Sequence, residues 1–160
     1  MLNTCAEVGN GNLAPHEEEA HFAIWCLMSS PLLAGNNLSE ATPALIKTLT
    51  ARGPLSVNQD PLALQGQLCG NGTDGAGGLW QAYAKPLAGG ATAALLLNRN
   101  ASGAVNASLA FDACNVSAHA TTVTDLWTGE ALGSFTHEWS AMVPAHAHRL
   151  VKIAPPHREL

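Results

Sequence analysis

The sequence contains few charged residues, and positive charge is the scarcest. Only 12% of its 160 residues are charged, and 7 Lys and Arg stand against 12 Asp and Glu, which gives a net charge of −5. A nucleic-acid-binding protein needs a basic face that neutralises phosphates, so this composition argues against that class. Because 47% of the residues are hydrophobic, the chain should instead build a packed core.

Long hydrophobic runs are also missing. The longest run, Phe22–Met28, is far shorter than the roughly 18 residues that a membrane span requires. No membrane association is therefore predicted. The first residues, Met1–Glu7, have neither the basic start nor the apolar centre of a signal peptide.

Cysteines are few, and their spacing is not that of a metal site. Cys5, Cys26, Cys69 and Cys114 include no C-x-x-C pair and no zinc-ligand spacing. Four cysteines allow three disulfide pairings, and the spacing does not choose among them. Cys26 lies inside the apolar run, so we expect it to be a buried free thiol.

Two further patterns have plain structural explanations. His146 and His148 have no cysteine or acidic ligand close in sequence, so a surface turn explains them better than a metal site. Trp80, Trp127 and Trp139 could form a surface on which sugars stack, but aromatic residues on the strands of a sandwich belong more often to its core. The sequence predicts neither a metal nor a cofactor.

The chain does contain an excess of acceptor sites for N-linked glycans. Five Asn-x-Ser/Thr sequons, several times the number expected by chance, begin at Asn37, Asn71, Asn100, Asn106 and Asn115. This excess indicates a protein of the secretory pathway, although a Ser/Thr-rich sandwich can also accumulate sequons without using them. Sequons without a signal peptide suggest that the natural start lies upstream of Met1.

Residues 1–62 follow a helix–strand–helix order that is typical of α/β proteins. A helix is predicted over Pro15–Ser30, because proline suits the first helical position and three glutamates follow it. Leu32–Ala34 is a short apolar run of the kind found in buried parallel strands. A second helix is predicted to begin at a Thr42 cap and to end at Gly53.

The pattern changes after residue 62. A glycine-rich linker loop is predicted over residues 63–78, and an antiparallel β-sandwich over residues 79–160. The expected strands are Leu79–Ala84, Ala91–Asn98, Val105–Phe111, Thr121–Trp127, Gly133–Trp139 and Arg149–Ile153.

The first segment cannot form a complete fold by itself. One or two parallel strands and two helices can neither close a barrel nor satisfy their own strand edges. We therefore expect residues 1–62 to be the tail of a larger α/β domain.

Both halves of the chain contain short motifs that occur in the same order in one known protein family. They are Glu7-Val8-Gly9-Asn10-Gly11, His21–Trp25, Ser30–Gly35, Val57–Leu62, Gln65-Gly66, Lys85-Pro86-Leu87, Leu95–Arg99, Asp125-Leu126-Trp127 and Val143–His146. In this order they closely resemble the late barrel region and the following domain of the family 27 glycoside hydrolases, which are the α-galactosidases (melibiases) and their α-N-acetylgalactosaminidase relatives.

This resemblance implies a fold that is α/β plus all-β: the tail end of a (β/α)₈ TIM barrel, followed by a C-terminal antiparallel β-sandwich. It implies a retaining enzyme that hydrolyses terminal non-reducing α-D-galactose residues, without a cofactor, and that is vacuolar, lysosomal or extracellular. An α-N-acetylgalactosaminidase fragment and a non-catalytic module that binds a glycan or a partner remain alternatives. A homodimer also remains open.

The catalytic groups of the family do not map onto this chain. Retaining glycosidases need two carboxyl groups about 5–5.5 Å apart. Glu17 to Glu19 and Glu40 are better explained as charges near helix starts, Asp60 as part of a structural turn, and Glu7 occupies a motif position that is not catalytic in the family. Both carboxylates are expected upstream of Met1, so this chain alone should be inactive. By resemblance, Met1 is expected to be a substrate-binding residue.

Overall fold

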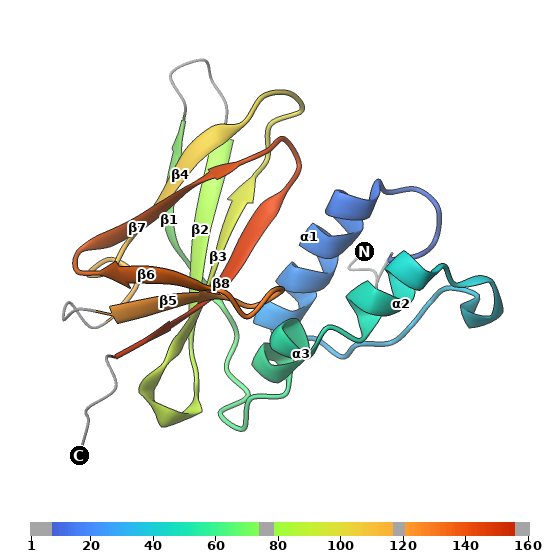
Figure 1. Ribbon diagram of the computed structural model, residues 1–160, viewed down its shortest axis with the longest axis horizontal. Coiled ribbons are helices and arrows are strands. Elements are labelled where there is room, and N and C mark those ends of the chain that lie inside the picture. The colour runs from blue at the N-terminus through green and yellow to red at the C-terminus, as the bar shows by residue number, and fades with distance from the viewer. Residues whose placement is uncertain (1–7, 74–78, 117–120, 156–160) are drawn as a thin grey trace.

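The computed structural model describes residues 8–73, 79–116 and 121–155, and it shows a group of helices packed against one side of a β-sandwich (Figure 1). The helices are α1 (Pro15–Leu27), α2 (Pro43–Leu49) and α3 (Arg52–Asn58), with short 3₁₀ turns η1 (Leu38–Glu40) and η2 (Ala88–Gly90). The strands are β1 (Gln67–Thr73), β2 (Leu79–Pro86), β3 (Thr92–Asn98), β4 (Val105–Ala110), β5 (Thr121–Asp125), β6 (Ala131–Phe135), β7 (Glu138–Val143) and β8 (His148–Ala154).

Two antiparallel sheets make up the sandwich. The larger has the strand order β1-β2-β3-β8-β5-β6, and the smaller pairs β4 with β7. In the larger sheet Leu95 of β3 lies opposite Tyr83 of β2 on one side and Leu150 of β8 on the other. All three side chains face the helices, so this row is the floor on which the helical layer packs.

Strand β3 is buried on both faces of the sheet. Ala94 and Leu96 belong to the core between the two sheets, whereas Ala93 and Leu95 pack against Leu27 of α1 and other residues of the helices. Successive side chains of a strand point to opposite faces, so a strand covered on both sides needs apolar residues at every position. This explains the uninterrupted apolar run of β3.

The first helix begins where the sequence predicts. Pro15 takes its first position, and the Glu17 side chain accepts a hydrogen bond of 2.8 Å from the backbone N–H of Ala14. The helix ends at Leu27 rather than Ser30, because the backbone at Ser29 turns to a positive φ of 50°.

The second predicted helix is two helices in the structure. Thr42 caps α2 as expected, and its hydroxyl oxygen accepts from the N–H of Leu45 at 3.1 Å. Gly53 does not end a helix and lies in the first turn of α3 instead. A Cβ at this position would lie 1.7 Å from the carbonyl oxygen of Leu126, so glycine is needed for close packing against the sandwich.

The predicted linker is partly wrong. Residues 67–73 of the expected 63–78 loop form β1, an edge strand of the larger sheet, so the sandwich begins at Gln67 rather than at residue 79. A Cβ on Gly72 would lie 2.6 Å from the Trp80 ring, which indicates that this glycine admits the indole instead of forming a turn.

Two other strand predictions need correction. The strand expected over 133–139 is divided between β6 and β7, because the chain turns at residues 136 and 137. The parallel strand expected at Leu32–Ala34 does not form; only Ala34 makes an isolated bridge, and Leu33 is 57% exposed.

A disulfide joins Cys69 of β1 to Cys114, which follows β4, with 5.0 Å between the two Cα atoms. It therefore ties an edge strand to the opposite sheet. Cys26 is a buried free thiol, as predicted, and burial raises its pKa to about 12. Cys5 lies outside the described residues. Within the described segments, no helix is long and apolar enough to cross a membrane.

Candidate functional site

The joint between the helical layer (residues 8–62) and the sandwich is centred on Lys85, which is fully buried in β2. Its ammonium group donates hydrogen bonds of 2.6 Å to the hydroxyl oxygen of Ser29 and to the carbonyl oxygen of Val57. Burial lowers the pKa of Lys85, and the negative charge of Asp60 opposes that shift. One strand residue thus binds the segment after α1 and the helix α3 together.

Asp60 reinforces this joint from the other side. One carboxylate oxygen accepts from the N–H of Leu62 at 3.0 Å and closes a turn, as the sequence predicts. The other oxygen accepts from the N–H of Ala88 at 2.9 Å, in the connection between β2 and β3. The carboxylate is therefore structural, and it fixes the helical layer to the sandwich.

The glycine-rich segment that begins with Val8 and Gly9 lies against the start of α1. The N–H of Gly9 donates to the Glu18 carboxylate at 2.9 Å. Gly9 has a φ of +84°, and a Cβ there would lie 2.6 Å from the Leu45 side chain and 2.9 Å from the Asn36 amide nitrogen. Both the backbone conformation and the crowding require glycine at this position.

Next to this segment the helical layer forms an open apolar pocket of about 310 Å³. Val8, Phe22, Leu32 and Leu49 contribute to its walls, together with the polar side chain of Asn36. The amide nitrogen and oxygen of Asn36 are both buried and form no hydrogen bond within the described residues. A group that carried both a donor and an acceptor would satisfy this amide.

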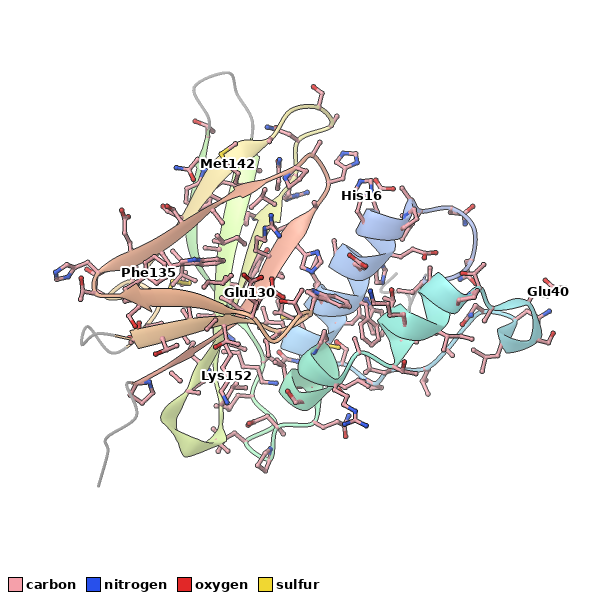
Figure 2. All side chains as sticks on the ribbon, in the orientation of Figure 1. His16, Glu40, Glu130, Phe135, Met142 and Lys152 are labelled. Carbon is pink, nitrogen blue, oxygen red and sulfur yellow. A yellow bond between two sulfur atoms is a disulfide. The ribbon has the colours of Figure 1, made fainter. Side chains whose placement is uncertain are left out.

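The candidate carboxylates are spread over the helical layer. Glu17 and Glu18 accept hydrogen bonds from backbone N–H groups, and the bond from Ala14 is the main cause that lowers the pKa of Glu17. Glu40 lies in η1, at the outer end of the helical layer (Figure 2). Glu7 and Met1 lie outside the described residues, so the substrate contact expected of Met1 stays a prediction.

The two histidines have different environments. The Nδ1 atom of His146 lies 2.7 Å from a carboxylate oxygen of Glu17, at the surface. His148 is buried, so the surface turn expected for it is wrong. Its Nε2 atom accepts a hydrogen bond of 2.7 Å from the indole N–H of Trp127, and burial lowers its pKa to about 4. No group of three metal-ligating side chains occurs among the described residues.

The three tryptophans of the sandwich also differ. Trp139 is 3% exposed and belongs to the core between the sheets, and Trp80 packs against the same core. Trp127 is half-buried between the sandwich and the helices, where it touches two of the three apolar clusters. The predicted core role therefore suits Trp139 best.

Both halves of the chain match known proteins. A family model described as the alpha galactosidase C-terminal beta sandwich domain matches residues 77–153. A probable alpha-galactosidase of Dictyostelium discoideum is 34% identical over 150 residues, which are 92% of this chain and 38% of that protein. The chain is therefore similar to the C-terminal part of the α-galactosidases, and its sandwich matches their C-terminal domain.

Other relatives agree with this assignment. The alpha-galactosidase of Coffea arabica is 33% identical over 149 residues, which cover 93% of this chain and 38% of that protein. The solved structure of alpha-galactosidase I from Mortierella vinacea has a TM-score of 0.85 and 28% identity, over 94% of this chain and 38% of that chain. The chain thus spans less than two fifths of the length of these relatives.

The fold is also shared with a family 27 β-L-arabinopyranosidase from Geobacillus stearothermophilus, with a TM-score of 0.82 at 19% identity over 98% of this chain and 37% of that chain. At this identity the likeness concerns the fold alone.

Sequence reasoning missed the roles of Lys85, His148 and Asn36. A signal for Lys85 was present, because a single lysine interrupts a strand that is otherwise uncharged, just before Pro86. No local signal distinguishes His148 or Asn36, since their partners or pocket walls come from distant segments.

Proposed function

We propose that these residues form the C-terminal part of a retaining α-galactosidase, which hydrolyses terminal non-reducing α-D-galactose residues from galactosides, oligosaccharides or glycoconjugates. The observation that supports this most is the extent of the similarity. Relatives named α-galactosidases match the helical layer as well as the sandwich. A sandwich used as an independent binding module would not need to keep the helices of a catalytic domain with it.

In this proposal, the joint between the helical layer and the sandwich lets the sandwich support the helices of the catalytic domain. Lys85 connects them through a buried and a half-buried hydrogen bond, and Asp60 through an exposed one. Catalytic groups must be held within a fraction of an ångström by rigid supporting elements. The sandwich would then act as a brace for the late part of the catalytic domain.

The 160-residue polypeptide by itself is expected to be inactive. Retention requires a nucleophile and a general acid about 5–5.5 Å apart. The described carboxylates Glu17, Glu18 and Asp60 are occupied with backbone N–H groups of caps and turns. Turnover of a chromogenic α-galactoside by this purified polypeptide, above a blank, would contradict this part of the proposal.

A chimera tests the proposal directly. This chain would replace the matching C-terminal 38% of the Coffea arabica enzyme, and hydrolysis of p-nitrophenyl α-D-galactopyranoside would be measured. We expect a soluble chimera with measurable turnover, whereas the plant enzyme without its C-terminal part should have none. A folded chimera that lacks turnover, beside an active parent enzyme, would overturn the proposal.

The α-N-acetylgalactosaminidase alternative differs in the group recognised at the 2-position of the sugar. The family resemblance implies that this group is read by a loop that is not part of residues 1–160. The two curated relatives described above are named α-galactosidases, which favours galactose over N-acetylgalactosamine as the sugar recognised.

The same proposal places the protein in the secretory pathway, as a vacuolar, lysosomal or extracellular enzyme. Cys69 and Cys114 form a disulfide, and disulfides persist in oxidising compartments such as the secretory pathway. Four sequon asparagines are exposed, namely Asn37, Asn71, Asn106 and Asn115, and Asn100 is half-buried. Expression in a eukaryotic secretory host, followed by glycopeptide mass spectrometry, should find glycans at the exposed sites. Unmodified peptides at all five would contradict this assignment.

A further inference from the structure

A groove of about 410 Å³ opens between α1, α2 and the turn that follows β5. Its volume lies in the range of small-molecule sites. Trp127 supplies its aromatic wall, and the polar lining comes from Glu19 of α1, Lys47 at the end of α2, and the hydroxyl groups of Thr50 and Thr128. No part of the function proposed above uses this groove.

The aromatic wall is held in place before any ligand arrives. The indole N–H of Trp127 donates a hydrogen bond to the buried His148, and the centroid of its ring lies 6.4 Å from that of the Phe22 ring. One carboxylate oxygen of Asp125 accepts from the backbone N–H groups of Trp127 and Thr128, at 2.8 and 3.0 Å. A fixed wall loses little entropy when a ligand binds, which favours affinity.

The lining combines one aromatic surface with groups of both charges. A carboxylate accepts hydrogen bonds, an ammonium donates them, and threonine hydroxyl groups do both. Glu19 would repel an anion, and Lys47 would repel a cation. A neutral ligand with hydroxyl groups at its edge and an apolar face fits this set, and pyranose rings have both features.

We propose that this groove binds a neutral pyranoside. The C–H face of the sugar ring packs on the exposed part of Trp127, and its hydroxyl groups bond to Glu19, Lys47 and Thr128. This proposal does not depend on catalysis, because binding of sugar here requires no carboxylate pair and no turnover.

The experiment uses the whole 160-residue chain and methyl α-D-galactopyranoside, with methyl α-D-glucopyranoside as a second neutral probe. Binding is measured by saturation-transfer NMR and by tryptophan fluorescence. We expect saturation transfer to at least one of these pyranosides and none to inorganic phosphate observed by ³¹P NMR. Absence of transfer to both sugars at millimolar concentrations, or phosphate binding as tight as sugar binding, overturns the proposal.

Matched variants locate the site. Glu19→Gln and Lys47→Met should each weaken sugar binding about tenfold, because each removes a charged hydrogen-bond partner from the ligand. Glu40→Gln and Lys152→Met change the same residue types at exposed positions that do not line the groove, and they should leave binding unchanged. Circular dichroism verifies that each variant is folded. Sugar binding that is unaffected by the groove variants, or equally weakened by the controls, overturns the assignment.

Discussion

The ammonium group of Lys85 donates a 2.6 Å hydrogen bond to the carbonyl oxygen of Val57, so a strand of the sandwich and a helix share one buried polar contact. The same ammonium also holds the hydroxyl oxygen of Ser29. A buried ammonium is tolerated only where such partners replace water. Lys85 therefore makes the stability of the helical layer depend on the sandwich.

Lys85→Met should destabilise the protein. The variant leaves the carbonyl of the buried Val57 without its donor and removes the donor to the half-buried Ser29 hydroxyl, which costs about 2 kcal/mol in the free energy of unfolding. Urea unfolding followed by fluorescence measures this cost. Lys152→Met is the matched control on an exposed position of β8, and its change should stay below about 0.5 kcal/mol. A Lys85 variant as stable as the wild type would show that the ammonium contributes no net stability.

Gly53→Ala should be more damaging than its single methyl group suggests. The new Cβ would lie 1.7 Å from the backbone carbonyl oxygen of Leu126, so α3 must move away from the sandwich. We expect a loss of about 3 kcal/mol or more, measured by thermal unfolding. Gly70→Ala is the control, because its nearest contact, Ala82, is at an ordinary 3.4 Å and its backbone is not in the left-handed region. Equal effects of the two substitutions would contradict the packing explanation.

Loss of the disulfide should destabilise the sandwich. Cys69 and Cys114 are 45 residues apart, and the chain-entropy relation gives about 4 kcal/mol for a loop of that length. Dithiothreitol should therefore lower the melting temperature of the wild type. The double variant Cys69→Ala/Cys114→Ala should already have a lower melting temperature, and dithiothreitol should not lower it further. A reductant effect of the same size in this variant would contradict the assignment, because it would have to come from another disulfide.

Stability should fall with acid because of His148. Its folded-state pKa of about 4 lies below the ordinary 6.5, so the unfolded chain binds the proton more readily between these values. The contribution to stability is complete above about pH 6.5 and is lost as the pH falls toward 4, to a maximum of about 3 kcal/mol. Protonation also removes the acceptor for the Trp127 indole N–H.

Urea unfolding at several pH values, compared between the wild type and His148→Gln, isolates this contribution. Between pH 6.5 and 4, the free energy of unfolding of His148→Gln should fall by about 3 kcal/mol less than that of the wild type. The variant His137→Gln, at an exposed position, should keep the wild-type pH dependence. Identical pH profiles for the wild type and His148→Gln would exclude the buried histidine as the cause.

Much of the fold could be predicted from local signals. Pro15 and Thr42 mark helix starts because they satisfy the geometry and the hydrogen bonds of a first helical turn by themselves. The alternating and continuous apolar runs of β2 to β5 and β8 identify strands, because burial on one or two faces imposes that pattern. The buried state of Cys26 also follows from its apolar neighbours.

Glycine led to wrong predictions in three places. Gly53 resembles a helix end, and Gly70 and Gly72 resemble a loop, but the structure places them in α3 and β1. Glycine suits a turn and a close contact equally well, and only the neighbour, such as Trp80 or Leu126, decides between the two.

The sequence by itself determined the family resemblance, the starts of α1 and α2, and most strands of the sandwich, because these depend on residues close together in the chain. Only the tertiary structure decided the partner of Cys69, the ammonium contacts of Lys85, the burial of His148 and the groove beside Trp127. Each of these depends on groups that are tens of residues apart, and packing of the helices on the sandwich brings them within bonding distance.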